Sequence, residues 1–193
     1  SHNDGSMLRW RLHLSYSNPE EIAATPNAVF AAANGALFSV DKADDQLSYW
    51  SKATGLNGSS VAHIAYDEGA ERLIIAYENG QIDLLDQEGH VTQMPDISMK
   101  AGSIAVTINA ICVGSKYSYL AMPFGIIAIQ VRKGEVTDTH YIGNEAASIE
   151  VQEVVEMNDS LFAFSFDRMY KASPADNLVD YNYWASEAIP FEQ

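Results

Sequence analysis

The sequence predicts an all-β protein, a β-propeller in the form of a partial ring of about four four-stranded blades. The first observation is a glycine turn that recurs at intervals of 45 residues, at Gly35, Gly80 and Gly125. The second is that each interval divides into short runs of alternating apolar and polar residues, which is typical of strands. A repeat of about 40 to 50 residues that holds several short strands is the pattern of a propeller blade.

Four repeats are predicted, at about residues 20–51, 60–95, 106–142 and 148–185. The fourth has Arg168 where the others have glycine, 43 residues after Gly125. No window shows the apolar period of 3.6 that a helix needs. The second repeat is the clearest, and its four strands are expected at 61–66, 72–76, 81–85 and 90–94, with Asn79 and Gly80 forming the middle turn.

The strand pattern does not close a ring. Residues 8–16 alternate like an additional outer strand, yet the last repeat already has an outer candidate in 179–184. An incomplete ring exposes apolar blade faces and strand edges, so we expect self-association or a longer natural protein. Residues 1–6 are interpreted as an expression-vector remnant, and the propeller domain as residues 7–193.

Composition excludes several classes of partner. The 193 residues carry 11 Lys and Arg against 26 Asp and Glu, a formal net charge of −15, so phosphate backbones are repelled and nucleic acid is not expected. The longest apolar runs are strand-sized, which predicts no membrane insertion. No signal peptide is visible, and the single Cys112 cannot form a disulfide within the chain.

No motif of a known catalytic or cofactor site occurs, so we expect neither an enzyme nor a bound cofactor. Two acidic clusters could hold calcium, Asp86-x-Glu88-Gly89 and Asp41-x-x-Asp44-Asp45. Both lack the full ligand spacing of a calcium loop. They also fall at predicted hairpin turns, where Asp is favoured because its side chain bonds to the nearby backbone. The favoured interpretation is therefore that no metal site is present.

Asp83 lies within a predicted strand, between Ile82 and Leu84. Alternation places it on the face opposite to both, and an unpaired buried carboxylate would cost several kcal/mol. Two alternatives remain open for a structural role, that Asp83 is solvated or that it pairs with a neighbouring backbone group or cation. A ligand-binding role is a further possibility.

A binding face can be placed from propeller topology. Turns between the second and third strands of each blade share one face with the linkers between blades, and loops on such a face commonly bind partners. Exposed aromatic and amide side chains there would suit a protein or glycan surface. The alternative is that they are ordinary turn residues. The turns collect Met122, Pro123 and Phe166, and the candidate binding residues are Tyr77, Glu78, Asn79, Phe124, Asp167 and Arg168.

The run TGLNGSSVAHIAYDEGAERLIIAYENGQIDLLD, residues 54–86, resembles the repeat of two-component-regulator propellers. The segments LIIAYENGQIDLL, FGIIAI, DTHYIG and NLVDYNYW, with Trp10, are similar to the N-terminal propeller of the PorZ family of the type IX secretion system. This resemblance covers about residues 10–184.

The resemblance implies a non-catalytic interaction module of an exported accessory protein, at the cell surface or in the periplasm. Such proteins belong to a cell-surface attachment complex that delivers anionic lipopolysaccharide to a sortase. Implied partners are proteins of this complex, with a glycan or lipopolysaccharide as a further one. The alternative function is the periplasmic carbohydrate-sensing propeller of a hybrid two-component regulator.

Overall fold

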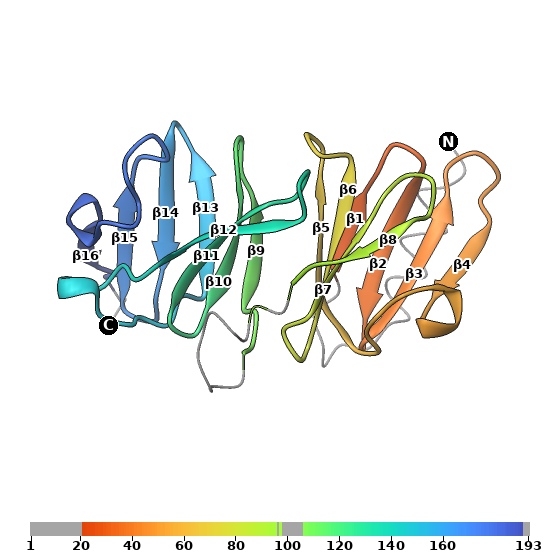
Figure 1. The fold of residues 1–193 in the computed structure, drawn as a ribbon, viewed down its shortest axis with the longest axis horizontal. Coiled ribbons are helices and arrows are strands. Elements are labelled where there is room, and N and C mark those ends of the chain that lie inside the picture. The colour runs from red at the N-terminus through yellow and green to blue at the C-terminus, as the bar shows by residue number, and fades with distance from the viewer. Residues whose placement is uncertain (1–20, 96, 98–105, 191–193) are drawn as a thin grey trace. The chain divides into compact units, whose positions relative to one another are not determined.

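A computed structural model describes residues 21–95, 97 and 106–190. Its described strands form four separate four-stranded antiparallel sheets, the blades of a partial β-propeller. Within each sheet the strands follow one another in sequence order, as the ribbon in Figure 1 shows. The chain divides into two compact units, residues 1–93 and residues 94–193, and each unit contains two blades.

The first unit holds blades 1 and 2. The strands of blade 1 are β1 (Glu21–Ala24), β2 (Ala28–Ala33), β3 (Ala36–Asp41) and β4 (Leu47–Trp50). The strands of blade 2 are β5 (Val61–Asp67), β6 (Arg72–Tyr77), β7 (Ile82–Leu85) and β8 (Val91–Gln93). The alternation that predicted the second repeat therefore located all four of its strands, with small differences at their ends.

Apolar side chains from the facing sheets fill the space between blades 1 and 2. Phe30 and Leu37 of blade 1 and Ile64, Leu73 and Ile75 of blade 2 belong to one buried cluster. Burial of such side chains removes apolar surface from water, which is the main favourable term in folding.

A carboxylate joins the inner strands of these two blades. Glu21 of β1 accepts a 2.9 Å hydrogen bond from the backbone N–H of Ile64 on β5, and its other oxygen lies 2.8 Å from Nδ1 of His63.

The second unit holds blades 3 and 4. The strands of blade 3 are β9 (Ala110–Val113), β10 (Ser118–Met122), β11 (Gly125–Gln130) and β12 (Glu135–His140). The strands of blade 4 are β13 (Glu153–Met157), β14 (Ser160–Phe164), β15 (Arg168–Ala172) and β16 (Ala185–Ala188).

Blades 3 and 4 also share a core and a carboxylate link. Tyr119 and Ile126 of blade 3 pack in one buried cluster with Val154, Leu161 and Trp184. Glu156 of β13 accepts hydrogen bonds from the backbone and side chain of Ser115, in the turn between β9 and β10. In both units, therefore, the two blades share an apolar interior, and a carboxylate of one blade accepts hydrogen bonds from the other.

The recurrent glycines all lie where the second strand of a blade turns into the third. One of the three is displaced by one residue relative to the strand that follows. Gly35 and Gly80 lie inside these turns at φ +81° and +85°, whereas Gly125 is the first residue of β11. Met122 pairs directly with Gly125, and Arg168 likewise begins β15. The length of this turn therefore varies between blades, although the turn itself occurs at the same place in each blade.

One strand prediction is wrong. The outer strand of blade 4 is β16, Ala185–Ala188, and not residues 179–184, so the fourth sheet extends past residue 185. Residues 181–183 instead form a 3₁₀ turn whose first N–H groups are capped by Asp180, which accepts a hydrogen bond from the backbone of Asn182. Trp184 then turns inward into the core, where its Nε1 donates to the carbonyl of Leu178. Capping and burial therefore override the strand propensity of this aromatic segment.

The predicted strand at residues 8–16 lies outside the described residues. None of the helices in the described ranges has the length and apolar character required to span a membrane.

Candidate functional site

The turns that were expected to bind a partner adjoin one another within the first unit. Asn34 and Gly35, between β2 and β3, line a hollow of about 340 Å³ together with Val61 and with Glu78 of the β6–β7 turn. Gly35 pairs with Val61, and the backbone N–H of Glu78 donates to the carbonyl of Ser60. Turns of neighbouring blades and the linker between them thus meet at this hollow.

Glu78 and Asn79 are both exposed there. The side-chain oxygen of Asn79 accepts a hydrogen bond from the N–H of Gln81, which stabilises the turn. The Glu78 side chain is left at the wall of the hollow, where it gives this surface a negative charge.

Tyr77 and Met122 were expected at the surface, and both expectations are wrong. The Tyr77 side chain is 1% exposed and Met122 is fully buried, so neither presents a side chain to a partner. Both are the last residues of their second strands, and their side chains point into the blade interiors rather than into the turns. A strand-end position cannot reveal this direction unless the strand's exact register is known.

Asp83 is buried and fully paired. Its carboxylate accepts hydrogen bonds from the backbone N–H of Asn57 at 2.7 Å, from the Asn57 side-chain amide at 2.9 Å, and from the Tyr77 hydroxyl. Of the alternatives left open, pairing with a neighbouring backbone group is the one observed. Burial and the hydrogen bond to Asp83 together raise the pKa of Tyr77 far above its usual range, so its hydroxyl stays protonated and donates.

Gly58 completes this buried network. A Cβ at position 58 would lie 2.4 Å from the Tyr77 ring, so only glycine allows the backbone of the linker to pass over it. Asn57 is thereby held where its N–H and amide both reach Asp83. The network fixes the linker between blades 1 and 2.

In the second unit, the predicted residues have different exposures and partners. Phe124 is half-buried and packs against Tyr141, with ring centroids 6.0 Å apart, and its carbonyl accepts from Ile149 in the blade linker. Asp167 is exposed, and its side chain accepts a 3.2 Å hydrogen bond from the Ser165 hydroxyl.

Arg168 is half-buried, and its guanidinium donates to the hydroxyl of Ser186 on β16. Phe166, beside these residues, is 69% exposed. Three of the six candidate binding residues therefore belong to each unit. That all six form a single binding face stays a prediction.

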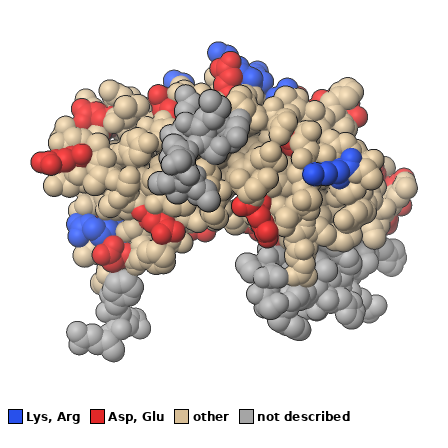
Figure 2. Space-filling model, turned by 60° about the horizontal axis from the view of Figure 1, so that its bottom comes forward, with Lys and Arg blue, Asp and Glu red and all other residues tan. Residues whose placement is uncertain are grey.

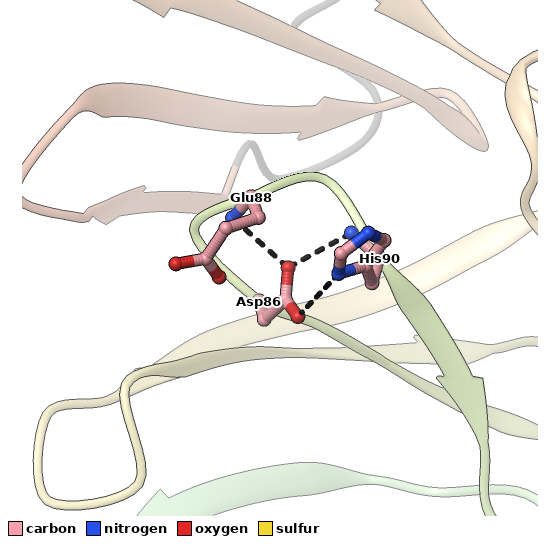
Figure 3. Close-up of polar contacts among 3 residues, drawn as sticks. All are labelled: Asp86, Glu88 and His90. Atoms are coloured by element: carbon pink, nitrogen blue, oxygen red, sulfur yellow. Dashed lines mark hydrogen bonds and ion pairs between the residues drawn. The ribbon is translucent and has the colours of Figure 1, made fainter.

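The acidic turn between β7 and β8 has a structural explanation. Asp86 Oδ1 accepts hydrogen bonds from the backbone N–H groups of Glu88 and His90, and its Oδ2 lies 3.2 Å from the imidazole of His90, as Figure 3 shows. Although burial opposes it, these contacts lower the pKa of Asp86 below its usual range.

The same three side chains could approach one ion, but the Asp86 carboxylate already serves the turn. In the other cluster, Asp41 and Asp44 accept from backbone N–H groups in the same way. In each described acidic cluster, Asp side chains therefore stabilise a hairpin turn by accepting hydrogen bonds from its backbone. This is a common role of Asp in hairpins.

An apolar face lies open on blade 4. The incomplete ring was expected to expose apolar blade faces, but the residues of this one were not predicted. One side of this sheet packs on blade 3, whereas residues of the opposite side are exposed or half-buried. Val155 is 41% exposed and Met157 53% exposed on β13. Phe162 and Phe164 stand beside them on β14, with Lys171 placed 5.5 Å from the Phe162 ring centroid. The sequence pattern could have revealed this face, because the strands of the fourth repeat carry apolar residues on both of their sides.

Figure 2 shows acidic side chains scattered among uncharged ones on the face in view. With a net charge of −15, the surface as a whole disfavours polyanions.

Comparisons with known proteins give a consistent family. The family model described as the N-terminal β-propeller domain of the type IX secretion protein PorZ matches residues 29–185. PorZ of Porphyromonas gingivalis, described as an essential bacterial surface component of the type IX secretion system, is 31% identical. Its structure aligns with a TM-score of 0.75 over 92% of this chain, which spans only 23% of that protein.

More distant structures share the fold. Virginiamycin B lyase from Staphylococcus aureus is 14% identical, with a TM-score of 0.63, and the alignment covers 88% of this chain and 55% of the lyase. The extracellular domain of a hybrid two-component system from B. thetaiotaomicron is 11% identical, with a TM-score of 0.65, covering 89% of this chain and 22% of that one. No curated protein sequence matches. On the family match and the identity to the P. gingivalis protein, the chain belongs to the PorZ N-terminal β-propeller family.

Proposed function

We propose that this chain is a non-catalytic interaction module of an exported accessory protein of the type IX secretion system. The observation that carries the proposal is the family match over residues 29–185, together with 31% identity to a protein described as a surface component of that system. The acidic turns and the buried Asp83 also support a module without catalysis, because their polar groups hold backbone in place.

The apolar face of blade 4 is the surface that we assign to protein contacts. Val155 and Met157 expose apolar side chains next to two phenylalanines, a combination that soluble monomers seldom leave open. In a propeller this side of a sheet packs on a following blade, and the solved PorZ chain is much longer than this one. Further protein therefore covers this face, and when the 193-residue chain is alone, a second copy does so.

The decisive experiment uses the full-length native protein in its own cell envelope. An affinity-tagged form is crosslinked in living cells and purified, and the captured proteins are identified by mass spectrometry. We expect components of the type IX secretion machinery, in excess over a strain that carries an unrelated tagged surface propeller. Repeated absence of these components would contradict the proposal.

The alternative of a carbohydrate-sensing regulator is tested by other observations. That function predicts a membrane-spanning segment and a kinase domain in the same gene, and transcriptional changes upon gene deletion. The 11% identity to the two-component domain supports the shared fold alone. Delivery of anionic lipopolysaccharide stays a prediction from the family resemblance, and the acidic surface opposes direct binding of such a glycan to this chain.

A further inference from the structure

Trp50 and His140 occupy equivalent positions in blades 1 and 3. Trp50 on β4 pairs with Leu37, the second residue of β3, and His140 on β12 pairs with Ile126, the second residue of β11. By the same register, Ser39 of blade 1 corresponds to Ala128 of blade 3. The two blades can therefore be compared position by position.

In blade 1 the polar group of the side chain at this position has a hydrogen-bond partner. Trp50 Nε1 donates a 2.8 Å hydrogen bond to the Ser39 hydroxyl, and its ring packs against Phe30 with centroids 5.9 Å apart. The hollow beside it has a volume of about 170 Å³. The β7–β8 turn closes one side, where Gln87 bridges Asn27 and Tyr66 by hydrogen bonds.

In blade 3 the corresponding polar group lacks a partner. His140 is 3% exposed, and its Nδ1 makes no hydrogen bond in the described part of the chain. Ala128 stands where blade 1 has the Ser39 hydroxyl, so the sheet offers the imidazole no equivalent acceptor. A buried polar group without a hydrogen bond is destabilising, so a native structure that keeps one needs an explanation, such as a bound ligand or an ordered water.

A groove with room for a ligand lies beside this imidazole, entirely within the second unit. Its volume is about 420 Å³, well above that of the blade 1 hollow and within the range of small-molecule sites. Residues 174–179 of the β15–β16 loop also line the groove. The side chains that line the groove and matter for recognition are Lys116, Tyr117, Tyr119, Asp138, His140 and Asn177.

The lining favours an uncharged, hydroxyl-bearing ligand. A neutral imidazole nitrogen either donates or accepts a hydrogen bond according to its tautomer, and a hydroxyl group can satisfy both cases. The Asp138 carboxylate and the Asn177 amide can bond to further hydroxyls, while tyrosine rings suit the apolar face of a sugar ring. The charged residues of the lining are Lys116, Asp138 and Asp176, one cation against two carboxylates, so the groove does not favour an anion.

Burial lowers the pKa of His140, although the nearby Asp138 carboxylate opposes this. The imidazole is therefore uncharged at neutral pH. An uncharged imidazole agrees with a neutral ligand. Lys116 Nζ lies 5.4 Å from the centroid of the Tyr117 ring.

We propose that this groove of blades 3 and 4 binds a neutral saccharide of one or two rings, with a ligand hydroxyl as the missing partner of His140 Nδ1. Because Nδ1 is buried in the structure, this contact requires the imidazole to turn about its Cβ–Cγ bond when the ligand binds. This site is separate from the protein-contact face of blade 4, and it does not depend on a role in secretion.

The test uses the purified 193-residue chain labelled with ¹⁵N, and follows the imidazole nitrogens by long-range proton–nitrogen NMR. The signals of His140 are assigned from their loss in His140→Phe. The neutral probes are methyl α-glucoside, N-acetylglucosamine and maltose, and the anionic probe is glucuronate. We expect at least one neutral probe to shift the His140 signals saturably, and glucuronate to bind more weakly.

Three variants make the result specific. His140→Phe removes the nitrogen and should weaken binding about tenfold, the effect of one lost hydrogen bond to a buried group. Asn177→Ala changes an exposed loop side chain, so it should weaken binding without unfolding the blade. Ala128→Ser supplies the hydroxyl that blade 1 has, so it should raise the thermal midpoint and weaken binding together. The matched control, Ser39→Ala, should leave binding unchanged.

The proposal is overturned if no neutral probe moves the His140 signals, which is also the result expected if only water fills the groove. It is equally overturned if glucuronate binds more tightly than every neutral probe, or if the affinity is the same in wild type, His140→Phe and Asn177→Ala. None of these results bears on envelope capture, so the proposed secretion role would stand or fall separately.

Discussion

The hydroxyl of Tyr77 donates a hydrogen bond to the buried carboxylate of Asp83, at 2.5 Å between Oη and Oδ2. The two residues come from neighbouring strands β6 and β7, and Asn57 in the preceding linker completes the set. A charged group that is removed from water must be compensated by such contacts. The network therefore couples the sheet of blade 2 to the linker that enters it.

Tyr77→Phe should destabilise the protein by about 1–3 kcal/mol, because the Asp83 carboxylate stays buried with one donor fewer. Equilibrium unfolding in urea, followed by tryptophan fluorescence, gives the change in free energy of unfolding. The control is Glu78→Gln, an exposed neighbour in the same turn, which should change stability by less than about 0.5 kcal/mol. Equal stability of Tyr77→Phe and wild type would show that the network contributes nothing.

Gly125→Ala should be more harmful than an ordinary glycine replacement. Its new Cβ would lie 2.2 Å from the backbone carbonyl oxygen of His140, and a backbone atom inside a sheet cannot easily move away. We expect a loss of about 1–3 kcal/mol or more, seen as a lower urea midpoint. Gly69→Ala is the matched control, since its nearest neighbour is Asp67 Oδ1 at 3.6 Å. A similar loss in both variants would contradict this steric explanation.

Asp86 should make the protein more sensitive to acid. Burial tends to raise its pKa, but hydrogen bonds from His90 and Glu88 lower it below the ordinary value of 3.8. Its contribution to stability is therefore fully present above the unfolded-state pKa, and is lost as the pH falls through the lower folded-state pKa.

Urea titrations between about pH 2 and pH 6 should consequently show a shallower acid dependence in Asp86→Asn than in wild type. The control is Glu88→Gln, which removes an exposed carboxylate that accepts none of the turn hydrogen bonds in Figure 3 and should leave the slope unchanged. If the slope for Asp86→Asn equals that of wild type, Asp86 is not held in its charged form by the turn.

The 193-residue chain should self-associate through the open face of blade 4. Analytical ultracentrifugation over a concentration series should show reversible dimers, and the double variant Val155→Glu, Met157→Glu should shift the equilibrium toward monomer by at least about tenfold. The control is Leu47→Glu, an equally exposed apolar residue on β4 of blade 1. A wild-type chain that is strictly monomeric at high concentration would refute this prediction.

The repeat in the sequence predicted the blades because strand period, turn glycine and spacing are local properties. Gly35, Gly80 and Gly125 indicated the corners to within one residue, and the alternation in residues 61–94 placed four strands. The prediction failed for the outer strand of blade 4, where capping by Asp180 and burial of Trp184 replaced strand pairing by a 3₁₀ turn.

The sequence by itself determined the all-β class, the fourfold repeat and the family, since these follow from residue spacing and from motifs along one chain. Tertiary structure decided which side chains are available. It buried Tyr77 against Asp83, and within the described residues it left His140 Nδ1 without a hydrogen-bond partner. The reason is physical: exposure and hydrogen bonding depend on what the neighbouring strand and blade place opposite a residue, and that information lies many residues away in the chain.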